Sequence, residues 1–100
     1  MNESNCGVAK TLHIIGSKWT MLILHNIFEG RNRFGQLQRT LDGISPKTLS
    51  VRLSELEKDG IVKRRVYAEV PLHVEYHLTE KGRSLREIFS ELAKWGEQTA

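Results

Sequence analysis

The sequence has a single cysteine, Cys6, and only two prolines among its 100 residues. One cysteine cannot form a disulfide within the chain, so a disulfide-stapled secreted scaffold is excluded and a reducing cytoplasm is the expected location. The longest apolar run, residues 19–27, is interrupted by polar side chains and is too short to span a bilayer. The first ten residues lack a basic head followed by an apolar stretch, so we expect no secretory signal and no membrane partner.

The motifs of enzymes and cofactor-binding proteins are also lacking. The chain has no glycine-rich phosphate loop, no metal-ligand spacing and no pairing of a nucleophile with a base. We therefore expect no catalytic residue, no cofactor and no enzymatic activity.

Four histidines nevertheless raise the alternative of a metal sensor. On a strand, His73 and His77 would lie about 13 Å apart, which is too far for one ion. Cys6 and His13 would lie about 10 Å apart along a helix. We expect no metal site within one chain, and only a site shared between subunits stays open.

Positive charge is concentrated in the middle of the chain. Residues 31–73 contain nine Lys/Arg against five Asp/Glu, whereas residues 1–30 are balanced and residues 74–100 carry four against five. A surplus of four could arise by chance. Its position nonetheless suits a segment that neutralises phosphates of a nucleic acid.

Apolar spacing predicts two helices before this basic segment. The first, over about residues 6–15, has Val8, Leu12 and Ile15 on one stripe. The second, over about residues 18–29, is apolar on almost every side, so it should be the central helix of the core.

A third and a fourth helix follow, separated by a tight turn at residues 42–44. Phe34, Leu37 and Leu41 give the third helix one buried stripe. The fourth has the best-marked start in the chain, because Ser45 is an N-cap residue and Pro46 occupies the first helical position. Gly60 is expected to end this helix.

The fourth helix has one apolar and one polar face. Leu49, Leu53 and Leu56 define the inward face, and at about 100° per residue Lys47, Val51, Ser54 and Lys58 point the opposite way. An ordinary solvated face would look similar. In this context we favour contact with DNA. Bases or adjacent phosphates are the expected targets of four side chains: Lys47, Thr48, Ser50 and Val51. Arg52 lies nearer the core edge, so its expected target is a phosphate.

Two strands and a last helix complete the pattern. Residues 61–67 and 74–78 predict a hairpin with its tip at residues 68–73. Arg64 and Arg65 on the first strand either contact phosphates or keep an edge strand from pairing with other sheets. Thr79 is expected to cap one continuous final helix, whose broad apolar stripe offers a dimer surface together with the first helix; the stripe comprises Leu85, Ile88, Phe89, Leu92 and Trp95.

These elements predict one domain over residues 1–100, mainly α with a small β-hairpin wing (α+β). The expected fold is a winged helix-turn-helix, with the helix-turn-helix at about 33–59 and the wing at about 61–78. The helices at about 6–15 and 80–97 would dimerise it.

An ordered set of motifs resembles the HxlR family of bacterial winged-helix transcription regulators over nearly the whole chain. Each motif is weak alone, but the order and spacing together are specific. They are Cys6, Gly16-Ser17-Lys18-Trp19-Thr20, Arg33-Phe34-Gly35, Gly43-Ile44-Ser45, Glu57-x-Asp59-Gly60-Ile61-Val62, Val74-Glu75-Tyr76-x-Leu78-Thr79 and Trp95-Gly96. The resemblance implies a homodimer that binds a palindromic DNA operator, with an effector that the motifs do not identify.

Two positions depart from the family pattern. The wing tip usually reads Pro-Pro followed by a basic residue, whereas this chain has Pro71-Leu72-His73. His73 is therefore expected to replace a permanently charged minor-groove contact by a pH-sensitive one. Ser17 replaces a second glycine, which should be harmless.

The resemblance also suggests a role for Cys6, because some family members sense oxidants or electrophiles with a cysteine at this position. A thiol in the first turn of a helix lies near the positive helix end, which favours the thiolate. With no second cysteine, oxidation would give a Cys6–Cys6 bridge between subunits or a mixed disulfide. The alternative is a small residue that only packs at the dimer interface.

A non-DNA function is the remaining alternative, since winged helices also serve as protein-interaction adaptors. Salt-sensitive binding to a specific palindrome distinguishes the two, because an adaptor would show neither property.

Overall fold

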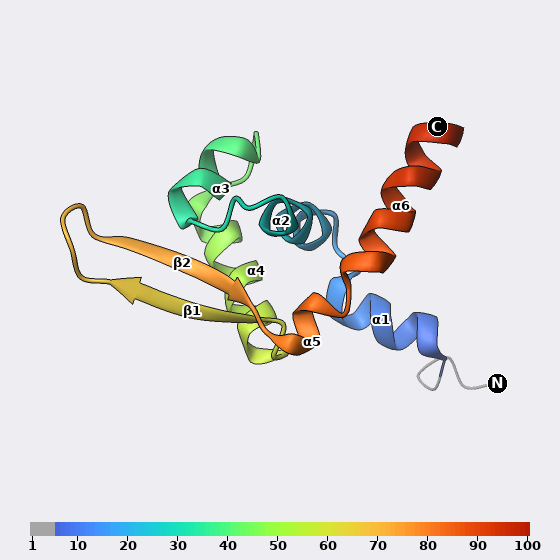
Figure 1. Cartoon of the computed structure of the whole chain (residues 1–100), viewed down its shortest axis with the longest axis horizontal. Helices are drawn as coiled ribbons and strands as arrows, with labels where there is room; N and C mark the ends of the chain where they lie inside the picture. The colour runs from blue at the N-terminus through green and yellow to red at the C-terminus, as the bar shows by residue number, and fades with distance from the viewer. Residues whose placement is uncertain (1–5) are drawn as a thin grey trace.

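The computed structural model describes residues 6–100 and shows a mainly helical chain with one antiparallel hairpin (Figure 1). The winged-helix architecture predicted from the sequence is confirmed. In chain order the elements are α1 (Gly7–Ile15), α2 (Lys18–Phe28), α3 (Phe34–Thr40), α4 (Pro46–Lys58), β1 (Val62–Tyr67), β2 (His73–Leu78), α5 (Glu80–Arg83) and α6 (Arg86–Thr99).

Helix α2 forms the centre of the core, as its apolar sequence predicts. Ile23 and Leu24 are fully buried, and Ile27 is nearly so. Ser17 caps the helix, since its Oγ accepts a hydrogen bond of 3.0 Å from the backbone N–H of Thr20. The residue that departs from the family pattern therefore stabilises the start of the central helix.

Helix α4 has the start, the end and the buried face that the sequence predicts. The Ser45 hydroxyl accepts a hydrogen bond from the Thr48 N–H at 3.0 Å, and Pro46 occupies the first turn. Gly60 follows the helix with φ +75°, a left-handed conformation that glycine adopts without strain. Leu49, Leu53 and Leu56 are at most 1% exposed, so the orientation of the helix about its own axis is fixed.

The hairpin protrudes from the helical body (Figure 1). Its strands pair with Val62 opposite Leu78 and Tyr67 opposite His73. Because β2 begins at His73, this residue belongs to the strand and not to the tip, contrary to the sequence-based boundary. A bridge between Arg33 and Glu75 attaches β2 to the segment before α3, and the Tyr76 N–H donates to the Asn32 carbonyl at 2.8 Å.

Alternation along the strands gives the hairpin two faces. The inner face packs toward the helices and carries the buried Val62 and Tyr76. The outer face carries Lys63, Arg65, Tyr67, His73, Glu75 and His77.

The expected single final helix is wrong, because the chain forms the short α5 and then the longer α6. Thr79 caps α5 by accepting from the Gly82 N–H at 3.0 Å. Gly82 is buried, and a Cβ there would collide with the carbonyl group of Ile61. This close contact fixes α5 against the end of α4, and a turn at Ser84 and Leu85 then redirects the chain into α6.

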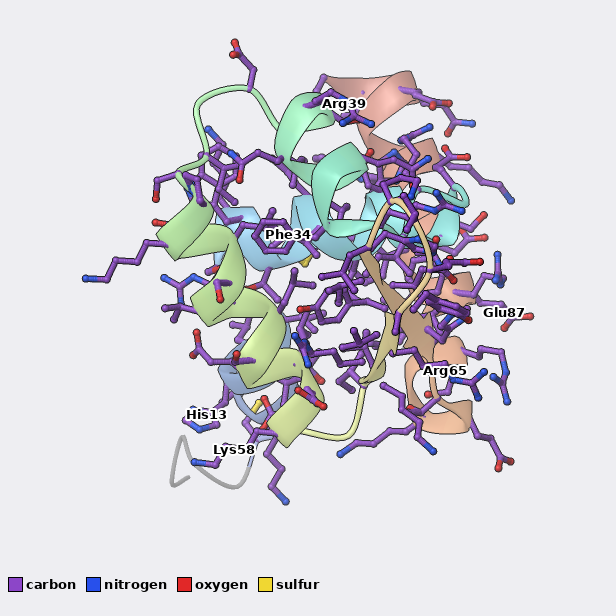
Figure 2. All side chains as sticks on the ribbon, turned by 90° about the vertical axis from the view of Figure 1, so that its left-hand side faces the viewer. His13, Phe34, Arg39, Lys58, Arg65 and Glu87 are labelled. Carbon is purple, nitrogen blue, oxygen red and sulfur yellow. The ribbon has the colours of Figure 1, made fainter. Side chains whose placement is uncertain are left out.

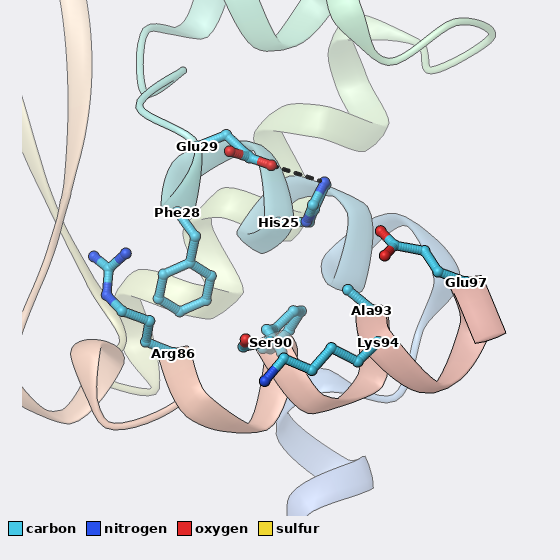
Figure 3. A pocket seen from close by; sticks show the side chains of 9 residues that line it. His25, Phe28, Glu29, Arg86, Ser90, Ala93, Lys94 and Glu97 are labelled. Atoms are coloured by element: carbon cyan, nitrogen blue, oxygen red, sulfur yellow. Dashed lines mark ion pairs between the residues drawn. The ribbon is translucent and has the colours of Figure 1, made fainter.

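Helix α6 packs on α2 through one side only. The Phe89 ring lies 5.2 Å from that of Phe28, and the Arg86 guanidinium lies 5.2 Å from the centre of the Phe28 ring. An open cleft of about 450 Å³ lies between the two helices. Figure 3 shows its lining side chains, with the ion pair of His25 and Glu29 at its edge. The cleft is lined by both acidic and basic side chains.

The opposite side of α6 is apolar and has no covering element among residues 6–100. Ile88, Leu92 and Trp95 are 47%, 48% and 66% exposed. On α1, Val8 and Leu12 are also more than half exposed, at 68% and 57%. The predicted stripe on the last helix is therefore divided, with Phe89 in the core and three large side chains in solvent.

No helix formed by residues 6–100 combines the length and apolar character that crossing a membrane requires.

Candidate nucleic-acid interface

The outward face of α4 is polar and accessible, as expected from its burial pattern. Lys47, Ser50 and Ser54 are exposed, and Val51 is 46% exposed. In Figure 2, α4 runs along one edge of the molecule and ends at the labelled Lys58, with the hairpin opposite. Short side chains on this face allow the helix backbone to approach base edges in a major groove.

Thr48 differs from its neighbours because it takes part in the helix cap. The Ser45 hydroxyl donates to Thr48 Oγ1 at 2.9 Å, while its oxygen accepts from the Thr48 N–H. The Thr48 side chain is half-buried. Its hydroxyl is therefore already engaged, unlike the hydroxyl of Ser50, for which no partner is found within residues 6–100.

Arg52 is also engaged within the protein. Its Nη1 donates to Oε1 of Glu55 at 3.0 Å, and its Nε is buried without a partner among the described residues. The side chain is 36% exposed. A phosphate contact by Arg52 would use the guanidinium donors that its ion pair with Glu55 leaves free.

Arg64 and Arg65 point to opposite faces of the hairpin. Arg64 pairs with Tyr76 on the inner face and Arg65 with Glu75 on the outer face. Figure 2 shows Arg65 on the side of the hairpin away from α4. The two arginines therefore cannot meet the same stretch of DNA backbone along one face.

The His73 ring contacts Glu75 on its own strand. Its Nε2 lies 3.0 Å from Oε2 of Glu75, and the Nε2 of His77 lies 2.9 Å from Oε1 of the same carboxylate. The distance expected from the sequence was measured between the backbones of His73 and His77 along the strand. Their side chains nevertheless converge on Glu75, which lies between them. No group of three metal-ligating side chains suited to an ion occurs in the described part of the chain.

Cys6 stands at the N-cap of α1 and is half-buried. Its side chain makes no capping hydrogen bond. It lies at the start of the helix that exposes Val8 and Leu12, the position expected for a residue at a dimer interface.

Two arginines near the wing were not assigned a binding role from the sequence. A groove of about 390 Å³ between α3 and β2 is lined by Arg33 and Arg39, together with His73. The local surplus of basic residues was the available signal. The contact between α3 and the hairpin that unites these side chains is not encoded by spacing along the chain.

The family model for HxlR-like helix-turn-helix proteins matches residues 14–100 of this chain. Among curated sequences, the uncharacterized HTH-type transcriptional regulator YybR of Bacillus subtilis is 43% identical across 96% of this chain and 77% of its own length. The regulatory protein MalR of Fusobacterium mortiferum is also 43% identical, across 97% of this chain and 92% of its own.

Solved structures give the same result for the fold. The redox regulator HypR in its reduced form has a TM-score of 0.85 and 42% identity, covering 93% of this chain and 92% of its own. The transcriptional regulator YodB from B. subtilis, also reduced, has a TM-score of 0.77 and 38% identity, covering 95% of this chain and 94% of its own.

Proposed function

Because the chain belongs to the HxlR-like helix-turn-helix family of transcriptional regulators, which are not enzymes, we propose that it binds a palindromic DNA operator as a homodimer. The observation that carries this proposal is the seating of α4. Three leucines bury one face completely, so the side chains of Lys47, Ser50 and Val51 face outward beside a basic hairpin. Such a regulator acts in the cytoplasm, where operator DNA is found.

Sequence readout is assigned to the N-terminal half of α4. Lys47 can donate to guanine or to a neighbouring phosphate, and the Ser50 hydroxyl can donate or accept. Val51 offers a methyl surface for the C5-methyl group of thymine. Thr48 contributes at the cap, where it holds the N-terminal turn in shape.

Phosphate contact by the wing is assigned to the inner face of the hairpin. Arg64 lies on the face that packs toward α4, whereas Arg65 lies on the opposite face beside Glu75. A duplex held by α4 therefore approaches Arg64 first. Arg65 instead makes the edge strand β1 highly charged, which opposes pairing with another sheet.

Homodimer formation is assigned to α1 and α6. Helix α6 exposes three large apolar side chains, those of Ile88, Leu92 and Trp95. Helix α1 likewise exposes Val8 and Leu12. Large exposed apolar patches of this kind mark protein interfaces. A two-fold axis there would place two copies of α4 about 34 Å apart, one helical turn of DNA.

A redox response is a second candidate, favoured by the position of Cys6 at the start of α1 and by two structural neighbours that are redox-linked. HypR is a redox regulator, and YodB is known in a diamide-treated form. An oxidant of the diamide type, which accepts two electrons and two protons, would join the Cys6 thiols of two chains by a disulfide. Such a bridge would alter the spacing between the two copies of α4.

Lys47→Ala should weaken operator binding at least about fivefold, about 1 kcal/mol, because a positively charged donor is lost at the base-reading end of α4. The operator is first obtained by selecting bound sequences from a random DNA pool, and affinity is then measured by fluorescence anisotropy at physiological salt. Lys94→Ala removes the same charge from α6 and should leave affinity unchanged. Equal affinities of Lys47→Ala and wild type would refute this assignment.

Arg64→Ala should reduce the slope of log K against log salt by about 0.9, the value for one lost phosphate contact. Arg65→Ala is the matched control, since it removes an identical side chain from the other face of the same strand. The slopes are measured on one operator across several salt concentrations. A change in the Arg65 variant with none in the Arg64 variant would contradict the proposed face.

Leu92→Glu should convert the dimer to a monomer and reduce operator affinity by at least about tenfold, because a buried charge opposes assembly and each monomer holds one half-site. Ser90→Glu adds the same charge to another side of α6 and should remain dimeric. Light scattering after size exclusion measures the mass. A dimeric Leu92→Glu protein would exclude this surface as the interface.

Diamide treatment should produce a Cys6-linked dimer on a non-reducing gel and change operator affinity more than about fivefold, about 1 kcal/mol. Cys6→Ser should show neither effect, and a thiol reductant should reverse both in the wild type. Oxidation that leaves operator affinity untouched would end the redox proposal without affecting the DNA-binding proposal.

A further inference from the structure

Glu75 is the centre of a polar cluster on the outer face of the hairpin. Each of its oxygens accepts from one histidine, Oε2 from His73 at 3.0 Å and Oε1 from His77 at 2.9 Å. The Arg33 Nε lies 3.5 Å from Oε2 and joins the cluster to the segment that precedes α3. Because an ionised carboxylate only accepts, both rings must carry a proton on Nε2.

His73 has a second acceptor at its other ring nitrogen. Nδ1 lies 3.4 Å from the carbonyl oxygen of Pro71, in the tip of the wing. In a neutral ring that donates from Nε2, Nδ1 carries no hydrogen. It then presents a lone pair to this oxygen and cannot donate to it. The doubly protonated ring donates to both acceptors.

The His73 ring also contacts an aromatic ring and a second carboxylate. The ring is stacked on Tyr67, with centroids 4.8 Å apart and planes inclined by 8°, an arrangement that attracts a cation to the aromatic face. Glu69 in the tip approaches Nε2 at 3.9 Å and adds a second carboxylate. Arg33 and Arg39 in the adjoining groove oppose the charge, but Arg33 itself is paired with Glu75.

Glu75 keeps its negative charge where histidines titrate. Burial acts to raise its pKa, but hydrogen bonds from His73 and His77 and the nearby charges of His77 and Arg33 outweigh this effect, so its pKa lies below the ordinary 4.5. A carboxylate of lowered pKa stabilises the fold above its unfolded pKa and loses that contribution only as acid protonates it. Between pH 6 and 8 Glu75 is therefore a constant acceptor.

His77 provides an internal comparison. Its ring contacts the same carboxylate, but its side chain is 40% exposed, against 17% for His73. Lys63 stands opposite it on β1, and Arg65 stands opposite Glu75. No contact between Nδ1 of His77 and another described residue is found, so protonation of His77 adds charge without tying the tip to the strand.

We propose that His73 is a proton-dependent brace of the wing. A proton taken from solvent at Nδ1 links the Pro71 carbonyl through the ring to Glu75, and Glu75 to Arg33 before α3. With the ring protonated, the tip is fixed relative to the helix-turn-helix and carries one more positive charge than with the neutral ring. The DNA consequence of this brace rests on the proposed function, whereas the brace itself is a property of the free protein.

The first measurement uses the free full-length protein. Hydrogen-exchange protection of the amides in residues 67–73, corrected for intrinsic rates, should rise roughly fivefold from pH 8 to pH 6, as expected when a charge-assisted bond forms. His73→Gln keeps a neutral donor toward Glu75 and should show no rise. His25→Gln, on α2 beside the cleft of Figure 3, should behave as wild type. Equal responses of wild type and His73→Gln would overturn the brace.

The second measurement uses the selected operator. Operator affinity should rise roughly fivefold from pH 8 to pH 6 in the wild type and in His25→Gln, because a wing tip that is already fixed loses less conformational freedom on binding. It should not change with pH in His73→Gln. The same pH response in all three proteins would overturn the effect on DNA. Absence of specific binding by every protein would instead defeat the proposed function, and the exchange data would still decide on the brace.

Discussion

The burial of one leucine face of α4 is the interaction on which the rest of the structure depends. Leu49, Leu53 and Leu56 lie against a core built around α2, and burial of three leucines contributes about 2 kcal/mol each relative to exposure. Rotating the helix would expose them, so its outward residues are held in one direction without any contact of their own. The polar surface is thus oriented by the apolar one.

The hairpin is oriented by a different kind of interaction. It extends beyond the core, and strand β2 is held to the segment before α3 by the Arg33–Glu75 bridge and by the Tyr76–Asn32 hydrogen bond. These contacts are polar and partly exposed, so each is weaker than the leucine packing under α4. Helix α4 is therefore rigidly seated, whereas the hairpin is held by a few polar contacts.

The helices and their caps could be predicted from the sequence because they depend on local rules. Ser45, Pro46 and Gly60 bound α4 through capping and backbone geometry, and these features need no partner distant in sequence. The break between α5 and α6 could not be predicted, because it depends on the contact of Gly82 with Ile61 in space. The two faces of the hairpin follow from alternation, but which face meets α4 is decided by tertiary packing.

The His73 cluster was within reach of sequence reasoning. Residues 73, 75 and 77 alternate on one face of a strand, so a carboxylate between two histidines is implied by spacing alone. The sequence-based prediction against a metal site used only the backbone distance between His73 and His77. It did not include Glu75, which lies between them. Arg33 could not have been added from the sequence, since it joins from a segment more than forty positions away.

The Ser45–Thr48 cap has a consequence for altering this protein. Since the Thr48 hydroxyl is committed to holding the helix start, substitution there disturbs the scaffold together with any recognition it provides. Lys47, Ser50, Val51 and Ser54 carry no comparable duty within residues 6–100. A combinatorial library confined to these four sites would redirect the protein to new target sequences while leaving its architecture intact.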